Sequence, residues 1–318
     1  MITIVYSYES PCYCVTQKDM NIVMITILLI AGSASTSGAI LDNSGQLGNS
    51  PVKLADESIV LRVGIISDIH YAAKPNLNDR YYCHSLDKAK QAVETFNNNG
   101  TDFLVLLGDN IDETDKETDI ENLQRLDDLL EHFKGERHYV LGNHDLGELN
   151  KEEFIAQTGG EGNSSYYSFT RGEYFFIILD GNFKNDGAEY SRGNFHWTDS
   201  FIPSDQQKWL VNELKRSVSH EKKVIIFIHQ ILCDEDDSHG VKNADQIRRI
   251  LEQQGNVLAV FQGHNHKGSY KIINGIHYIG IHPMVVGESN AYAELIICRE
   301  GSLTLRGFGR QPGMDLIP

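Results

Sequence analysis

The chain has 318 residues, of which 41% are hydrophobic and 23% are charged, so it can bury a sizeable core as one large domain. Its formal net charge is −16 at pH 7. This charge argues against duplex nucleic acid and anionic membranes as partners, because binding to either depends on basic residues that displace counterions.

The first forty residues differ from the rest of the chain. Residues 22–31 are apolar except for one threonine, and Lys18 precedes them. Such a run is too short to cross a bilayer core of roughly 30 Å as a helix, and small residues offer cleavage positions near Ala34 or Ala39. We therefore expect residues 1–40 to be a signal peptide. The protein would then be exported (periplasmic or secreted) without a stable membrane span, with a cytoplasmic location as the alternative.

The segment that follows, residues 41–57, is rich in Asp, Asn, Ser and Gly and is typical of a tether. We expect one domain over residues 58–318. Its three cysteines, Cys83, Cys233 and Cys298, are odd in number and widely spaced, so they indicate no disulfide framework and are best read as small hydrophobic residues.

Four apolar, β-branched runs and one shorter run, residues 138–141, recur along this domain, and a polar motif follows each of them. The runs are residues 61–66, 103–107, 138–141, 224–228 and 257–261. The motifs are Asp68-Ile69-His70, Gly108-Asp109-Asn110, Gly142-Asn143-His144-Asp145, His229 and Gly263-His264-Asn265-His266. Each motif is therefore expected at the carboxyl end of a buried strand. Loops converge at that edge in open α/β sheets, so these distant residues are expected to meet at one site.

Helices are expected between the strands. Apolar residues recur at helical spacing over residues 85–96, 119–133 and 204–218. Beyond residue 269 the pattern changes to short strands over residues 270–273, 276–281, 292–297 and 303–308, and Asn274-Gly275 predicts a hairpin turn.

The residue types in the motifs indicate a site for two metal ions. Imidazole and carboxylate together bind divalent transition ions, and two neighbouring ions need a ligand that bridges them, for which Asp109 is the candidate. Asp68 and His70 are spaced i and i+2, as are His264 and His266. The two side chains of each pair can point at one site if the backbone stays extended beyond the strand. Two divalent ions, Asp68, Asp109 and a hydroxide leave a charge near +1 with a neutral Asn143, which favours a phosphate ester.

These motifs, in this order, resemble the calcineurin-like metallophosphoesterase family, with the pattern D-x-H, G-D-x, G-N-H-[DE], H and G-H-x-H over residues 61 to about 310. The resemblance implies an α/β fold, a four-layer α/β/β/α sandwich of two mixed sheets, with a dinuclear metal site at the carboxyl ends of strands. It implies that the first ion is held by Asp68, His70, Asp109 and His266. It implies that the second is held by Asp109, Asn143, His229 and His264.

The same resemblance implies a mechanism and cofactors. A hydroxide that bridges two divalent ions (Mn, Fe or Zn) would attack phosphorus in line, with His144 as general acid and Asp145 orienting its imidazole. The substrate would be a small phosphorylated metabolite with a phosphodiester, diphosphate or phosphomonoester group. The alternative is an exported nucleotide-binding protein that is stabilised by metal and has no turnover.

Looser similarity places the chain near the manganese-dependent ADP-ribose/CDP-alcohol diphosphatases and secreted bacterial phosphatases. It rests on residues 80–86, 205–210, 290–293 and 307–310. It makes Arg80 and Tyr81 candidate substrate contacts, since a guanidinium can hold a second phosphate by two hydrogen bonds. Asn110 follows the bridging residue and could donate to a phosphoryl oxygen. Four further histidines could line the pocket and have no assigned role: His84, His196, His239 and His282.

Overall fold

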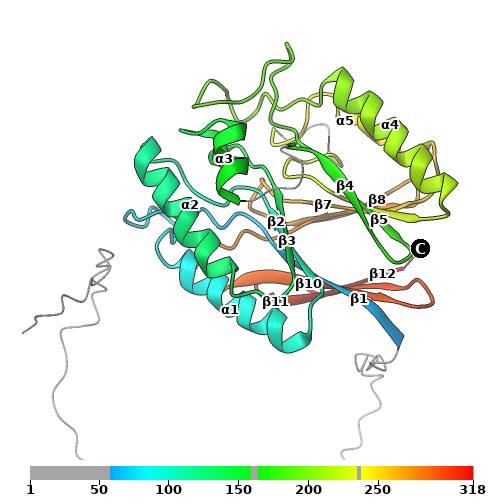
Figure 1. Ribbon diagram of the computed structural model, residues 1–318, viewed down its shortest axis with the longest axis horizontal. Coiled ribbons are helices and arrows are strands. Elements are labelled where there is room, and N and C mark those ends of the chain that lie inside the picture. Colours follow the sequence, from blue (N-terminus) through cyan, green and yellow to red (C-terminus); the bar gives the residue numbers. More distant parts are fainter. Residues whose placement is uncertain (1–57, 159–163, 235–237, 318) are drawn as a thin grey trace, which may run out of the picture.

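The computed structural model describes residues 58–158, 164–234 and 238–317. The expected signal peptide and tether lie outside these residues. Two six-stranded sheets pack face to face, and helices cover the outer face of each (Figure 1). Both sheets contain parallel and antiparallel neighbours. The expected four-layer α/β/β/α sandwich of two mixed sheets is therefore confirmed.

The first sheet has the order β12-β11-β10-β1-β2-β3. Strands β1, β2 and β3 run parallel, and β10 pairs antiparallel with β1 although it lies near the other end of the chain. The strands are β1 (Ile59–Ile66), β2 (Phe103–Leu107), β3 (Glu136–Val140), β10 (Ala291–Cys298), β11 (Leu303–Gly309) and β12 (Met314–Leu316).

The second sheet has the order β4-β5-β6-β7-β9-β8, with β5, β6, β7 and β9 parallel. Its strands are β4 (Tyr167–Arg171), β5 (Tyr174–Ile178), β6 (Lys223–Phe227), β7 (Val257–Gln262), β8 (Ser269–Ile273) and β9 (Ile276–Gly280). The predicted turn between β8 and β9 is confirmed, because Ile273 pairs with Ile276 and both Asn274 and Gly275 have positive φ. This conformation is the one that an Asn-Gly hairpin favours.

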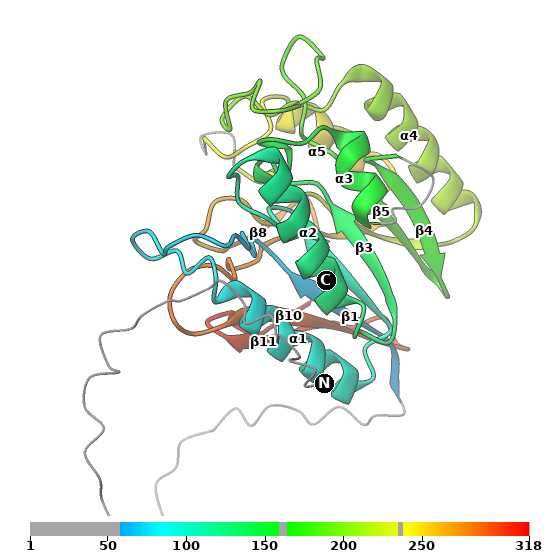
Figure 2. The same cartoon turned by 60° about the vertical axis from the view of Figure 1, so that its left-hand side comes forward.

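Helices α1 (Ser85–Asn99) and α2 (Lys116–Leu130) cover the first sheet, and α4 (Ser204–Ser219) and α5 (Ala244–Glu252) cover the second (Figures 1 and 2). A short helix, α3 (Lys151–Thr158), packs beside α2. Apolar side chains fill three layers, one between the sheets and one beneath each pair of helices. No helix in the described ranges is long and apolar enough to cross a membrane.

Helix α2 begins three residues earlier than expected. The carboxylate of Asp115 accepts a hydrogen bond of 3.0 Å from the amide of Thr118 and caps the helix. Elements that the apolar pattern did not single out are α3, α5, the β4–β5 hairpin and β12. None of these four carries a motif residue, so the strands that position the motifs are those expected.

Candidate metal centre

The five motifs meet at one end of the sandwich. The first three follow the parallel strands β1, β2 and β3 of the first sheet, and the last two follow β6 and β7 of the second sheet. Backbone hydrogen bonds join neighbouring motifs. The amide of His70 donates to the carbonyl of Asp109 (2.8 Å), and the amide of Gly263 donates to the carbonyl of His229 (2.9 Å). The site therefore lies at the carboxyl ends of strands from both sheets, and it forms only when the two sheets are packed together.

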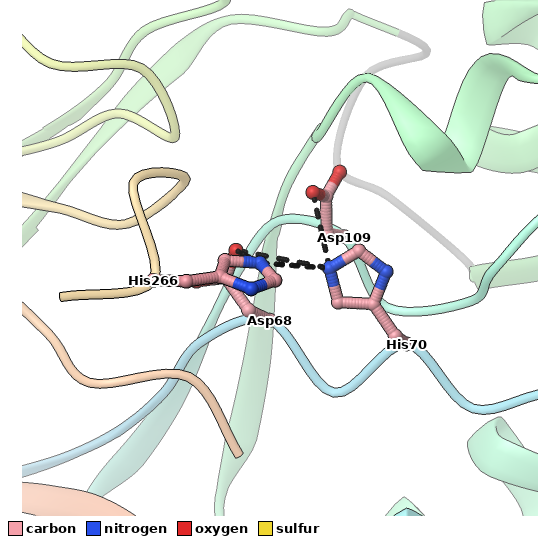
Figure 3. A group of neighbouring side chains, drawn as sticks. All are labelled: Asp68, His70, Asp109 and His266. Carbon is pink, nitrogen blue, oxygen red and sulfur yellow. Dashed lines mark hydrogen bonds and ion pairs between the residues drawn. The ribbon is translucent and has the colours of Figure 1, made fainter. Parts of the chain in front are cut away.

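Asp68, His70, Asp109 and His266 form the first group of side chains, and their ligand atoms point toward one another (Figure 3). The Nε2 atom of His266 lies 3.2 Å from Oδ1 of Asp68 and 3.2 Å from Nε2 of His70. Nε2 of His70 lies 3.4 Å from Oδ2 of Asp109. The structure thus brings together all four residues expected around the first ion.

Asp109, His229 and His264 form the second group. Oδ2 of Asp109 lies 3.1 Å from Nε2 of His229, and that nitrogen lies 3.2 Å from Nδ1 of His264. Asp109 therefore presents the same oxygen to both groups, which suits a bridging ligand. Asn143 directly precedes the turn of His144–Leu146 that follows β3, and its Oδ1 is buried with no hydrogen-bond partner among the described residues.

The residues present fit a pair of divalent metal ions. The Nδ1 atoms of His70 and His229 lie 3.0 Å from Asp112 and 2.8 Å from the carbonyl of Leu107. These contacts direct both Nε2 atoms to the groups around Asp109 and fix the tautomer that a metal-bound histidine needs. A buried amide oxygen without a partner, as in Asn143, is costly unless a cation or donor completes it. Imidazole, carboxylate and amide donors together suit manganese, iron or zinc.

The charges of the site show the same need for cations. Burial opposes ionisation of Asp109, yet His229 and His144 hold the pKa of that carboxyl well below its usual value. Burial disfavours a charged His229, yet the Asp109 carboxylate raises the pKa of His229 to about 9. Burial and the neighbouring His229 lower the pKa of His264 to about 3. The buried carboxylates thus draw positive charge, which bound metal ions would supply.

The backbone at the ligands differs from the expectation. Five of the expected ligands have left-handed φ values and are not extended: Asp68 (51°), His70 (44°), Asp109 (51°), His264 (69°) and His266 (56°). Only four other non-glycine residues in the described ranges share this conformation. A non-glycine residue there costs on the order of 1–3 kcal/mol, and such strain concentrates at functional sites. The chain therefore turns sharply after β1, β2 and β7, and this turning aims the side chains inward.

Two glycines allow the motifs to approach closely. A Cβ atom at Gly142 would overlap the amide nitrogen and Oδ1 of Asp109, and one at Gly108 would overlap the ring of His229. Gly108 also has a φ of +89°, which side chains disfavour. The glycines of the second and third motifs are therefore required by the space around Asp109 and His229.

The prediction that Asp145 orients the His144 imidazole is wrong. Asp145 turns away from that ring, and its carboxylate accepts hydrogen bonds from the amide (2.7 Å) and side chain (2.9 Å) of Asn110 and from the amides of Ile111 and Gly142. The reason lies in the single 3₁₀ turn of His144–Leu146, since successive side chains of such a turn point in directions about a third of a circle apart. Asp145 therefore holds the second and third motifs together.

Asp112 takes the role that was expected of Asp145. Its Oδ1 lies 2.7 Å from Nδ1 of His144 and 3.0 Å from Nδ1 of His70, and Lys74 lies 2.6 Å from its other oxygen. Glu113 also contacts Nδ1 of His144. Burial opposes a charged His144, but Asp109, Asp112 and Glu113 raise its pKa well above the usual value. The sequence offered one signal for Asp112, a carboxylate three residues after the bridging Asp109.

The expected substrate contacts are less clearly placed. The amide group of Asn110 donates one hydrogen to Asp145 and keeps one, so its role at a phosphoryl oxygen stays a prediction. The ring of Tyr81 packs against His84 and Lys88, and the backbone of Arg80 pairs with Leu77. Among the described side-chain contacts, none links Arg80 or Tyr81 to the metal groups, and their roles also stay predictions.

Comparisons with known proteins agree with this geometry. The family model described as calcineurin-like phosphoesterase matches residues 61–268. A manganese-dependent ADP-ribose/CDP-alcohol diphosphatase of Arabidopsis thaliana is 24% identical over 79% of this chain and 95% of its own length. A serine/threonine-protein phosphatase CPPED1 of Bos taurus is 28% identical over 58% of this chain and 60% of its own. The crystal structure of a dimetal phosphatase from Danio rerio superposes with a TM-score of 0.73 at 20% identity, covering 81% of this chain and 99% of that one.

Proposed function

Because the chain belongs to the calcineurin-like phosphoesterase family and is a metal-dependent hydrolase of phosphate esters, we propose that it cleaves the diphosphate linkage of nucleoside diphosphate esters. The observation that carries the metal-dependent chemistry is the single oxygen of Asp109 shared by two groups of ligands. The named diphosphatases from two plants, which align with 79% and 72% of this chain, support a diphosphate as the substrate and manganese as the metal.

The residues of the chain would divide the work in the following way. When bound, two divalent ions stabilise the charge of the phosphoryl oxygens and make water a strong nucleophile near neutral pH. Asp68, His70, Asp109 and His266 would hold one ion. Asp109, Asn143, His229 and His264 would hold the other.

We infer that His144 gives a proton to the departing oxygen. Its Nδ1 faces Asp112 and Glu113, so the proton available to a substrate is the one on Nε2. Asp112 keeps the imidazole charged and fixes its direction, while also holding His70. Asp112 is therefore a positioning residue for both the acid and a metal ligand.

We expect Asp112→Asn to lower kcat by about 10- to 100-fold at saturating manganese, the range seen when the hydrogen-bond partner of such a histidine is removed. KM should change little, because Asp112 acts through His144. Steady-state kinetics and a metal titration would measure these effects. The alkaline fall in the pH profile of kcat should begin at a lower pH than in the wild type, since a less stabilised imidazolium gives up its proton at lower pH.

Asp145→Asn serves as the contrasting variant. The new side-chain NH2 group would face donors that now bond to the Asp145 carboxylate, and some of these hydrogen bonds would be lost. The melting temperature should therefore fall along with activity. If Asp145→Asn lowers kcat without a loss of stability while Asp112→Asn has no effect, then Asp145 and not Asp112 supports the acid.

The substrate proposal is tested with residues 41–318, stripped with chelator and reloaded separately with manganese, iron or zinc. ADP-ribose, bis-p-nitrophenyl phosphate and p-nitrophenyl phosphate would be offered to each preparation. We expect the highest kcat/KM with ADP-ribose and manganese. A clear preference for either nitrophenyl ester would contradict the diphosphatase assignment and favour a diesterase or a monoesterase.

We also propose that the protein is exported. Support comes from the apolar run of residues 22–31 and the small residues that follow it, all of which lie outside the described residues. Expression of the full chain in a bacterium, followed by fractionation and intact mass, measures this directly. A processed chain that begins near residues 35–40 in the exported fraction is expected, and an unprocessed chain confined to the cytoplasm would contradict the proposal.

A further inference from the structure

An exposed tryptophan stands beside the metal centre. The ring centroid of Trp197 lies 6.1 Å from that of His264, a residue of the second group, and the two rings meet edge to face. On another side, the indole lies 4.7 Å from the ring of His239, which in turn lies 5.0 Å from His264. Trp197 therefore belongs to the rim of the site on the side of the second group.

The segment that carries Trp197 is held firmly. It joins β5 to α4 and extends at the top of both views in light green (Figures 1 and 2). The ring of Phe195 stacks on the fully buried Tyr190 at 4.3 Å, and the amide of Asp199 donates to the carbonyl of His196 (2.8 Å). The amide of Lys242, in the loop after β6, also donates to the carbonyl of Ser200 (2.8 Å). The backbone on both sides of Trp197 is therefore anchored to the body of the protein.

The exposure of Trp197 is what needs a reason. The residue is 38% exposed although its segment has packed Tyr190 and Phe195 into the protein. A large flat ring that stays in water next to a catalytic centre gives up burial that would otherwise stabilise the fold. The rings of His239 (4.7 Å) and His196 (5.8 Å) lie beside the indole, and the part that stays exposed is a surface on which a planar heteroaromatic group can stack. Such stacking tolerates different bases because each has a π face.

We propose that Trp197 is a specificity-determining residue that stacks the base of a nucleoside diphosphate ester while the diphosphate lies at the metal ions. The proposal rests on the diphosphatase activity proposed above and names the part of the substrate that the centre itself does not bind. In a nucleotide, one ribose lies between the base and the 5′-phosphate. The indole of Trp197 is in direct ring contact with His264 of the second group, so it lies at a similar remove from a phosphate at the metal ions. His239 backs the indole and so limits its tilt.

A purely structural role for Trp197 would be to shield His264 from water. The two roles differ in what they predict for substrates without a base. Loss of a shield changes the metal centre and lowers the turnover of every substrate, whereas loss of a stacking ring affects only substrates that carry a base.

The kinetic test compares ADP-ribose with dimethyl diphosphate, which has the same linkage and no ring. Trp197→Ala should lower kcat/KM for ADP-ribose by about tenfold or more, mainly through KM, as expected when stacking of one base is lost. Turnover of dimethyl diphosphate should stay within about twofold of the wild type, and Trp197→Phe, which keeps a flat ring, should recover most of the ADP-ribose activity. An equal fall for both substrates would overturn the proposal.

A binding test does not depend on turnover. The chain has two tryptophans. The other one, Trp209 on α4, is half-buried and packs against Tyr166. In a Trp209→Phe variant the indole of Trp197 is the only tryptophan fluorophore. AMP should quench its emission and ribose 5-phosphate should not, while the Trp197→Phe variant, which keeps Trp209, should show no difference between the two ligands.

The two experiments separate the two proposals. If the wild type fails to cleave ADP-ribose but AMP still quenches Trp197, the diphosphatase assignment fails and the stacking site stands. If ADP-ribose is cleaved and AMP quenches no more than ribose 5-phosphate does, the stacking proposal fails alone.

Discussion

Replacing Asp109 by Asn is expected to lower kcat/KM for every phosphate ester by roughly a thousandfold or more. Oδ2 of Asp109 is shared between Nε2 of His70 (3.4 Å) and Nε2 of His229 (3.1 Å), so it is the one oxygen that both metal groups use. An amide at this position is neutral and binds two cations poorly. Loss of a single preorganised charge contact at a reacting centre already costs about 10²–10³ in rate, and here the relation of two ions is lost.

The measurement pairs activity with metal content. Elemental analysis of Asp109→Asn after reloading should give about one ion per chain or fewer, against two for the wild type. Asp205→Asn, an exposed substitution of the same kind on α4, should retain full activity and both ions. Two bound ions together with normal turnover in Asp109→Asn would show that Asp109 does not bridge the centre.

Removal of the metal ions is expected to abolish activity and to lower the melting temperature by about 5 °C or more. Ions that bind only the folded chain stabilise it by about 2.7 kcal/mol at a concentration 100 times Kd, and for a domain somewhat shorter than this one each kcal/mol corresponds to about 2–4 °C. The strain of five ligands in left-handed conformation should add to this dependence, since bound metal holds the turns that carry it.

Thermal unfolding of the stripped protein, followed with increasing manganese, measures the effect. The melting temperature should rise with the logarithm of the metal concentration once binding is saturated. Asp109→Asn should show a much smaller rise over the same range. A stripped protein that melts at the same temperature as the loaded one would mean that the ions bind outside the centre described here.

The sequence was sufficient for the strands that precede the motifs and for the side chains that gather at their ends. Parallel strands buried on both faces read as continuous apolar runs, and the residues that follow β1, β2, β6 and β7 are at the carboxyl edge by necessity. The sharp turns at Asp68 and His264 were not visible, because an extended backbone also places i and i+2 on one side. Short or weakly patterned elements such as α3 also gave no clear periodic signal.

Side-chain direction within tight turns was the other limit. His144 and Asp145 are adjacent in the chain, and only the 3₁₀ geometry shows that one points to Asp112 and the other to Asn110. Trp197 is similar, since its position on the rim depends on how a loop packs around Tyr190 and Phe195. In each case the missing information is three-dimensional contact between residues whose types alone suggest several partners.

The order of strands in the first sheet also determines when the centre can form. His70 and His266 touch although they are 196 positions apart in the chain. Strand β1, which Asp68 and His70 follow, gains its neighbour β10 only after residues 291–298 have been made. Contacts between such distant segments form late, because the long intervening chain must first be ordered. A chain still emerging from the ribosome therefore lacks a complete first sheet, and it also lacks part of the ligand set until His266 has emerged. Acquisition of metal is thus coupled to the last stage of folding, and the rate of metal uptake by refolding protein would report completion of the native topology.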